Sequence, residues 1–363
     1  MDKFNPHLLI LAREARGLTQ ADLAKRAEIG QGTLSKLEAG LKAPTENTVS
    51  LLADTLGFPT SFMFQEGQPY GFPPYHYRKR KKLSAKALGR IVAEMNIRRM
   101  HVKRLSNSFE LAPKAALPEI DRDEYHGRAN RRLDIEDVAR SVREAWMLPT
   151  GPVHNMIELL ESKGGIVIPC DFGTDLIDAM SQRIDGMPTL FFVNMHSPAD
   201  RVRMTLAHEL AHMVLHTVSL ADDETMEEEA DQFAGAFLLP ADEIRSQLRQ
   251  FDLRHLANLK RYWKVSMQAI AMRASNLNLI SDYQAKMFWI EMSKLGYRKR
   301  EPNEPPREEP RLLRSMIAYH QRKLRYSVEE IAKLLNLTPD EFVRMYGPDA
   351  YPTHPKVQLR VVK

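Results

Sequence analysis

The stretch from Arg201 to His216 reads RVRMTLAHELAHMVLH and contains two histidines, His208 and His212, four residues apart. In an α-helix, residues four apart lie on the same face, one turn from each other. Two imidazoles at this spacing can reach one metal ion, and zinc is the ion for which the helical pattern is typical. We therefore predict that His208 and His212 bind Zn²⁺ from a single helix.

Glu209 lies between the two histidines and is predicted not to bind the metal itself. A carboxylate at this position can hold a water molecule and take its proton, because coordination to zinc makes that water acidic near neutral pH. Glu209 is thus the candidate general base for attack on an amide carbonyl. The five-residue pattern is short and occurs by chance in some chains, so the sequence around it has to supply further support.

A catalytic zinc needs a third protein ligand and an open position for water. Downstream, the segment from Glu227 to Pro240 reads EEEADQFAGAFLLP and predicts a helix over about residues 225–239. Glu227 and Asp231 share one face of this helix, so we predict that Glu227 binds the metal and that Asp231 supports a ligand histidine. The alternative is that the acidic residues only cap and solubilise the start of the helix.

These two segments together resemble the ImmA/IrrE family of metallopeptidases, whose pattern pairs this histidine motif with a helix of the form E-x-x-A-[ND]-x-F-A…LL-x-P. The resemblance extends more loosely over residues 135–300. It implies a zincin-like fold with a small sheet, general-base work at Glu209 and cleavage of repressors or related regulators inside the cell. The family pattern also has a histidine matching His216, which we interpret as an ordinary histidine at a helix end. The positions matching the family's zinc ligands are His208, His212 and Glu227.

The beginning of the chain, residues 1–66, reads as short helices separated by turn residues. Thr19 is the predicted cap of one helix, and a turn at Ile29 and Gly30 leads into a second helix. The apolar residues predicted to pack between these helices are Leu23, Ala24, Ala27, Leu34 and Leu37. The residues left to contact the major groove are Gln31, Thr33, Ser35 and Lys36, with Gln20 reaching a phosphate or base edge.

Residues 7–64 resemble the Xre class of phage-repressor helix-turn-helix domains, which implies a five-helix domain that binds double-stranded operator DNA, with dimers on palindromic sites as the expected mode. Residues 1–66 hold seven Lys and Arg against eight Asp and Glu, so the domain is not basic by itself. A bundle used only for protein contact or dimerisation therefore stays open as an alternative. In contrast, residues 76–104 carry eleven Lys and Arg against the single acid Glu94. This basic segment predicts a polyanionic partner, with a solvated helix face as the alternative.

The rest of the chain predicts a mainly α fold with a small β-sheet. Ile166–Ile168 and Thr189–Val193 have the apolar, β-branched character of short strands. Ser197 is the predicted cap of the histidine-bearing helix, because Pro198 suits the first helical position. The predicted domains are a helix-turn-helix domain (1–66), a linker and basic helical region (67–133), a zincin-like metallopeptidase domain with a helical extension (134–300), and a linker and C-terminal helical unit (301–363).

Several classes of protein are excluded or disfavoured by the composition. The 363 residues hold no apolar run long enough to cross a membrane and no signal-peptide pattern at the start, which predicts a cytoplasmic protein. Cys170 is the only cysteine, so neither an intrachain disulfide nor a thiolate zinc cluster can form. Cys170 could still act as a zinc ligand released by oxidation, but a buried inert thiol is the favoured interpretation.

Three functions follow from these patterns. The leading one is a DNA-binding regulator with a zinc endopeptidase that cleaves a repressor or an antitoxin-like protein, acting as a homodimer. The second is a non-proteolytic transcription factor whose zincin-like domain senses a ligand or a partner, and the third is a pure interaction protein. The complete set of His208, Glu209 and His212 favours the first function, because a scaffold has no need of a catalytic base between two metal ligands.

Overall fold

The computed structural model describes residues 3–71, 83–110, 118, 134–174, 176–216, 223–347 and 360–361. Two compact units make up the chain, and each is described here by itself. Unit 1 comprises Met1–Ala112, Phe172–Leu176 and Arg311–Lys363, and unit 2 comprises Pro113–Asp171 and Ile177–Pro310. Among the described residues, no helix has the length and apolarity that a membrane crossing requires.

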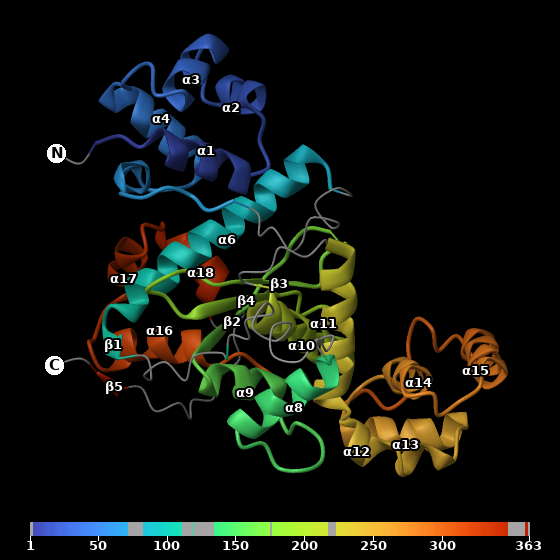
Figure 1. Ribbon diagram of the computed structural model, residues 1–363. Coiled ribbons are helices and arrows are strands. Elements are labelled where there is room, and N and C mark those ends of the chain that lie inside the picture. Colours follow the sequence, from blue (N-terminus) through green and yellow to red (C-terminus); the bar gives the residue numbers. More distant parts are fainter. Residues whose placement is uncertain are drawn as a thin grey trace, which may run out of the picture. The chain divides into compact units, whose positions relative to one another are not determined.

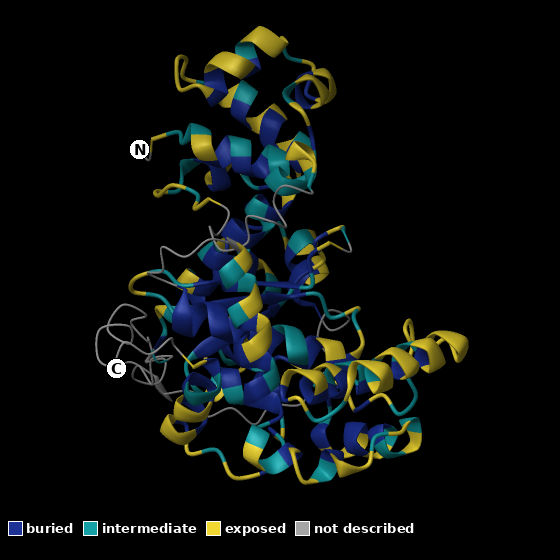
Figure 2. Cartoon of the chain, turned by 45° about the vertical axis from the view of Figure 1, so that its right-hand side comes forward, coloured by how far each residue is buried: buried dark blue, intermediate teal, exposed yellow. Residues whose placement is uncertain are grey.

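Unit 2 is built on a three-stranded sheet, which confirms the prediction of a mainly helical chain with a small sheet (Figure 1). The strands are β2 (Gly165–Pro169), β3 (Ala179–Gln182) and β4 (Thr189–Val193), in the spatial order β2-β4-β3. β2 and β4 run parallel, whereas β3 pairs antiparallel with β4. Every residue of β3 and β4 is buried, and Figure 2 shows the burial of the chain by colour.

Four helices surround this sheet: α8 (Ile135–Ala145), α9 (Met156–Ser162), α10 (Ala199–Leu215) and α11 (Asp223–Leu238). α10 packs on β3 and β4, and α11 packs against both α10 and α8 (Figure 1). α9 packs on β2. Phe233 and Phe237 of α11 stack one turn apart and are fully buried. The helix with the two histidines is thus held between the sheet and α11.

The start of α10 differs from the prediction. Pro198 rather than Ser197 occupies the N-cap position, and no side chain caps the helix. The Ser197 hydroxyl instead donates a hydrogen bond to Asp178 Oδ1 at 3.1 Å. Asp200 is buried, and its carboxylate accepts a hydrogen bond from Lys260 Nζ at 2.6 Å. The side chains of Ser197 and Asp200 thus bind residues that are distant in the sequence, and neither caps the start of the helix.

Further helices follow α11 in unit 2: α12 (Ala241–Ile244), the 3-10 helix η3 (Gln247–Arg249), α13 (Leu253–Trp263), α14 (Met267–Asn276) and α15 (Asp282–Lys294). The segment from Glu301 to Pro310, predicted as a linker, is anchored to this unit by its acidic residues. Lys260 Nζ lies 3.0 Å from Glu301 Oε2, and the buried Arg203 pairs with Glu308. The segment therefore belongs to the packed structure of unit 2.

Unit 1 begins with the five predicted helices: α1 (Pro6–Ala15), α2 (Gln20–Arg26), α3 (Gln31–Glu38), α4 (Glu46–Leu56) and the 3-10 helix η1 (Thr60–Phe64). Thr19 caps α2 as predicted, in a reciprocal arrangement with Asp22. All five apolar residues predicted to pack between α2 and α3 are buried. α2 and α3 pack on each other and, with the turn between them, form the predicted helix-turn-helix.

The remainder of unit 1 consists of α6 (Ala85–Ser106), α16 (Leu312–Arg322), α17 (Val328–Leu334), α18 (Pro339–Tyr346) and the antiparallel strands β1 (Phe109–Glu110) and β5 (Arg360–Val361). α6 packs against α1 and α16. The predicted basic segment ends in this helix, and residues 78–82 of that segment lie outside the described residues.

Two arginines of the basic segment, Arg99 and Arg104, make contacts within unit 1. The Arg99 guanidinium lies over the Tyr70 ring at 4.1 Å and donates to Asn96 Oδ1. Arg104 donates to the Leu334 carbonyl and to Gln65 Oε1. These two cations are used for packing, so the prediction of a polyanionic partner rests on the others, such as the exposed Lys86, Arg90 and Lys103.

Acidification is expected to weaken unit 1 through His101 of α6. This imidazole is fully buried, with Nδ1 2.8 Å from the Tyr346 hydroxyl. Burial, together with the positive charges of Arg98 and Arg104, lowers its pKa from 6.5 to about 3, whereas Glu341 acts in the opposite direction. The unfolded chain binds a proton below pH 6.5 that the folded protein excludes. The stabilisation that comes from keeping His101 neutral in the fold is therefore fully present above pH 6.5. It is lost progressively as the pH falls towards 3, and the free energy of unfolding decreases by up to about 1.4 kcal/mol per pH unit.

Urea unfolding curves recorded at intervals between pH 7.5 and pH 4.5 measure this slope. His101→Phe keeps an aromatic ring at the site and removes the titrating group, so its stability should depend less steeply on pH than that of the wild type. Equal slopes in the two proteins would assign the acid sensitivity to other groups.

Candidate metal centre

The three predicted ligands come together between α10 and α11. His208 Nε2 lies 3.1 Å from His212 Nε2, because one turn of α10 separates the two rings. From α11, Glu227 Oε1 lies 3.6 Å from His212 Nε2, and Oε2 lies 3.9 Å from His208 Nε2. One donor atom from each residue lies within 4.8 Å of the others.

This arrangement fits zinc. A tetrahedral zinc with bonds of about 2.0–2.1 Å holds its ligand atoms about 3.3 Å apart, and the distances of 3.1, 3.6 and 3.9 Å bracket that value. Two imidazole nitrogens and one carboxylate oxygen are also a donor set that zinc takes in catalytic sites. The His212 side chain is fully buried, whereas a fifth of the Glu227 side chain is exposed, so solvent reaches the site from the α11 side.

Asp231, predicted to support a ligand histidine, lies one turn beyond Glu227 on α11. Its Oδ1 is 2.8 Å from Nδ1 of His208. A proton on Nδ1 that is donated to this carboxylate leaves the lone pair of Nε2 directed at Glu227 and His212. The contact orients the ring, and the tautomer with the proton on Nδ1 is the one that metal binding through Nε2 requires.

His216 has a corresponding position beside His212, which differs from our interpretation of an ordinary histidine at a helix end. Its side chain is fully buried, with Nδ1 2.8 Å from Nδ1 of His212 and Nε2 3.1 Å from Glu229 Oε2. If His216 Nε2–H donates a hydrogen bond to Glu229, His216 Nδ1 can accept one from Nδ1–H of His212, which leaves His212 Nε2 free of a proton. Each of the two predicted ligand histidines is thus hydrogen-bonded to an acidic residue of α11. His208 contacts Asp231 directly, and His212 is linked to Glu229 through His216.

Glu209 is completely buried beside the ligands, and its carboxylate is held by β3. The Ser181 hydroxyl donates a hydrogen bond of 2.7 Å to Glu209 Oε2. The cluster of described residues whose ligand atoms converge consists of His208, His212 and Glu227 and does not include Glu209. Ser181 lies 28 residues earlier in the chain, and no local pattern in the sequence marks it as a partner of the histidine motif.

The predicted DNA-contacting residues lie on α2 and α3. Gln31, Ser35 and Lys36 are exposed on α3, and Thr33 is half-buried. Gln20 Nε2 donates a hydrogen bond of 2.7 Å to Glu38 Oε2, so this side chain is tied to α3. Glu38 is itself buried and pairs with Arg13 of α1 at 2.7 Å, which joins the three helices.

Comparison with family models matches two segments of this chain. Residues 161–275 match the IrrE N-terminal-like domain, a peptidase family. Residues 9–63 match the helix-turn-helix family. The chain joins a helix-turn-helix domain to an IrrE N-terminal-like domain. A search of curated proteins found no match.

The predicted fusion is thereby confirmed. The IrrE N-terminal-like domain contains the three-stranded sheet, α10 and α11, so the match covers the whole metal centre, including Ser181. The helix-turn-helix domain contains every residue predicted to contact DNA. Cys170 lies at the end of β2 and is buried, and it is not among the described residues that could hold the metal. This placement supports the interpretation of a buried thiol.

Proposed function

We propose that this protein is a DNA-binding regulator whose IrrE N-terminal-like domain is a zinc-dependent endopeptidase, and that it cleaves a repressor or an antitoxin-like protein. The observation that carries the proposal is the convergence of His208, His212 and Glu227 with the Glu209 carboxylate buried beside them. A structural zinc site would saturate the metal with four protein ligands and would not need a carboxylate next to it. Three protein ligands leave the position that a hydrolytic water requires.

Bound zinc would supply a Lewis acid that polarises the peptide carbonyl and makes the attacking water more acidic. Glu209 takes the proton from that water as it attacks the carbonyl carbon, and then delivers it to the nitrogen of the leaving amine. The Ser181 hydroxyl fixes one oxygen of the Glu209 carboxylate at 2.7 Å, which limits the orientations of the base. Asp231 and the Glu229–His216 pair keep the ligand imidazoles in place during these proton transfers.

The proposal is tested by incubating the zinc-loaded protein with candidate repressors and antitoxin-like proteins and identifying new termini by mass spectrometry. We expect a defined cut that disappears after treatment with a chelator and returns when zinc is added. If a partner instead releases the protein from DNA without ever being cut, the sensor function stated above explains the data and the peptidase proposal fails.

For the helix-turn-helix domain, we propose that α3 enters the major groove of an operator, with Gln31, Thr33 and Ser35 contacting base edges and Lys36 contacting the backbone. The exposure of Gln31, Ser35 and Lys36 supports this assignment. Gln20 is proposed to act near a phosphate while its hydrogen bond to Glu38 holds it against α3. A homodimer would place two such helices on the two halves of a palindromic site.

Replacing Lys36 with alanine is expected to weaken binding to all DNA sequences and to lower the salt dependence by about one unit of log Kd per log of salt concentration. Replacing Gln31 should instead relax discrimination between operator variants, at a cost of about 1–3 kcal/mol for the preferred base. Fluorescence anisotropy with a labelled operator at several salt concentrations measures both effects. Lys286→Ala, which removes an exposed cation of unit 2, is the matched control and should change neither.

A further inference from the structure

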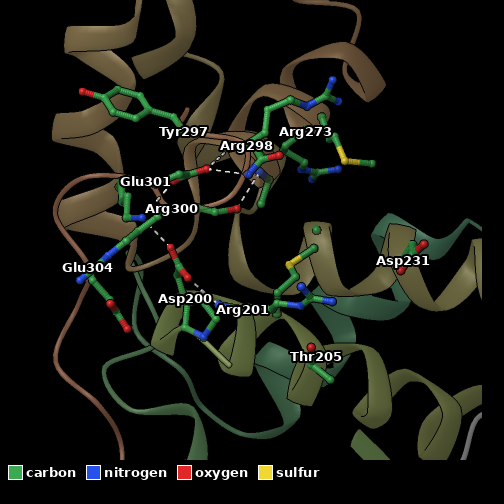
Figure 3. Close-up of a pocket in the computed structure, with 18 of the residues that line it drawn as sticks. Asp200, Arg201, Thr205, Asp231, Arg273, Tyr297, Arg298, Arg300, Glu301 and Glu304 are labelled. Carbon is green, nitrogen blue, oxygen red and sulfur yellow. Dashed lines mark hydrogen bonds and ion pairs between the residues drawn. The ribbon is translucent and has the colours of Figure 1, made fainter. Parts of the chain in front are cut away.

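Unit 2 contains an open groove of about 560 Å³, whose lining includes Thr205 of α10 and Asp231 of α11 (Figure 3). Its walls are the first half of α10, the middle of α11, one face of α14 and the segment from residue 297 to residue 304. The proposed chemistry does not use this groove, and neither the ligands nor Glu209 lines it.

The groove leads towards the metal centre along α10. Arg201, Met204 and Thr205 line it, and His208 follows at the same helical spacing, one turn beyond Met204. On the opposite wall, Asp231 both lines the groove and contacts His208 at 2.8 Å. An occupant of the groove therefore lies within one helical turn of a metal ligand.

One stretch of the rim of the groove carries three consecutive cations. Arg298, Lys299 and Arg300 are consecutive and exposed, and among the described residues no acid pairs with Lys299 or Arg300. The other cations of the wall are paired with acids. Lys260 binds Asp200 and Glu301, Arg273 pairs with Glu136, and Arg201 pairs with Asp178. The charges left to bind an occupant are those of residues 298–300.

The walls combine apolar surface with polar side chains that make no hydrogen bond to other described residues. Met272 of α14 is 54% exposed, and Met204 and Ala269 also line the groove. Within the described part of the chain, the side chains of Thr205, Gln232 and Asn276 make no hydrogen bond, although all three line the groove. Polar groups of this kind, spaced along an apolar groove, suit the amides and carbonyls of an extended peptide.

We propose that this groove binds an extended segment of the protein substrate next to the cleaved bond, with an acidic side chain at residues 298–300 and an apolar side chain over Met272. The inference rests on the proposed peptidase function and names its substrate class. Duplex DNA fits less well, because the apolar surface of Met204 and Met272 in the walls suits the side chains of a peptide and not a phosphate backbone. The groove selects acidic peptides and positions them for hydrolysis.

Binding can be measured without cleavage in the zinc-loaded full-length Glu209→Gln protein. The probes are three fluorescein-labelled peptides that differ only at their centre, which reads Glu-Glu-Leu-Leu, Gln-Gln-Leu-Leu or Lys-Lys-Leu-Leu. Trp289 provides a local signal, because Arg298 lies 4.9 Å from its ring, whereas the other two tryptophans, Trp146 and Trp263, are buried. We expect the acidic peptide to bind at least about tenfold more tightly than the glutamine peptide and to change the Trp289 fluorescence.

The double variant Lys299→Glu, Arg300→Glu should lose this preference and favour the lysine peptide, while Arg254→Glu, an exposed cation of α13 outside the groove, should bind as before. Equal affinity of the first two peptides, or displacement of the acidic peptide by duplex DNA alone, overturns the groove assignment. Tight, charge-dependent binding with no cut by the wild-type protein would leave the groove as a peptide site and would count against the peptidase function alone.

Discussion

Replacing either His208 or His212 with alanine is expected to abolish stoichiometric zinc binding. Each histidine is one of the three proposed protein ligands, and two ligands do not hold zinc in a site of this kind at ordinary free concentrations. The fold of unit 2 should survive, because α10 is also fixed by its contacts with the sheet and α11. Zinc per chain, measured by plasma mass spectrometry after dialysis, and circular dichroism of the same samples test both statements.

The α11 residues provide the matched comparison for this measurement. Glu227→Ala is expected to lose zinc as the histidine variants do, because Glu227 is the carboxylate that faces both Nε2 atoms. Glu228→Ala should keep it, since Glu228 is exposed on another face of the helix. Zinc retained by Glu227→Ala and lost by Glu228→Ala would show that the ligand register on α11 is wrong.

The parts of the site that could be predicted from the sequence depend on short-range regularities. The i, i+4 spacing of His208 and His212 and the shared face of Glu227 and Asp231 follow from the geometry of a helix, so the sequence alone specifies which side chains can meet. α10 begins one residue after the predicted first position, Pro198, and α11 lies within two residues of the predicted limits of 225–239, because apolar periodicity and Pro240 mark it. Strands β2 and β4 could also be predicted from the sequence, since both are rich in β-branched or aromatic residues.

The rest depends on contacts between residues far apart in the chain. β3 reads Ala-Met-Ser-Gln and has no strand-forming pattern, so it forms because β4 and α10 bury it, and with it comes the contact of Ser181 with Glu209. The link from Glu229 to His216 similarly requires α10 and α11 to be packed together. Glu301 and Glu308 looked like linker residues because their partners, Lys260 and Arg203, are buried cations that only the fold brings near.

Glu209→Gln is expected to abolish peptidase activity while leaving the metal site intact. Glutamine has the same shape as glutamate, and its amide oxygen can still accept the hydrogen bond from Ser181. It cannot take a proton from water, so cleavage should fall at least about 100-fold, the typical contribution of a general base. Zinc content should be unchanged, because Glu209 is outside the ligand set.

The same Glu209→Gln sample has to be assayed for zinc, for operator binding and for partner cleavage, since loss of cleavage alone could reflect loss of metal or of structure. Operator binding should persist, because the helix-turn-helix domain spans residues 9–63 and does not include the metal centre. Glu228→Gln is the matched control, since it makes the same chemical change at an exposed glutamate, and it should cleave normally. Undiminished cleavage by Glu209→Gln would rule out Glu209 as the base. Cleavage lost together with zinc would show that Glu209 acts on the metal site rather than on the proton.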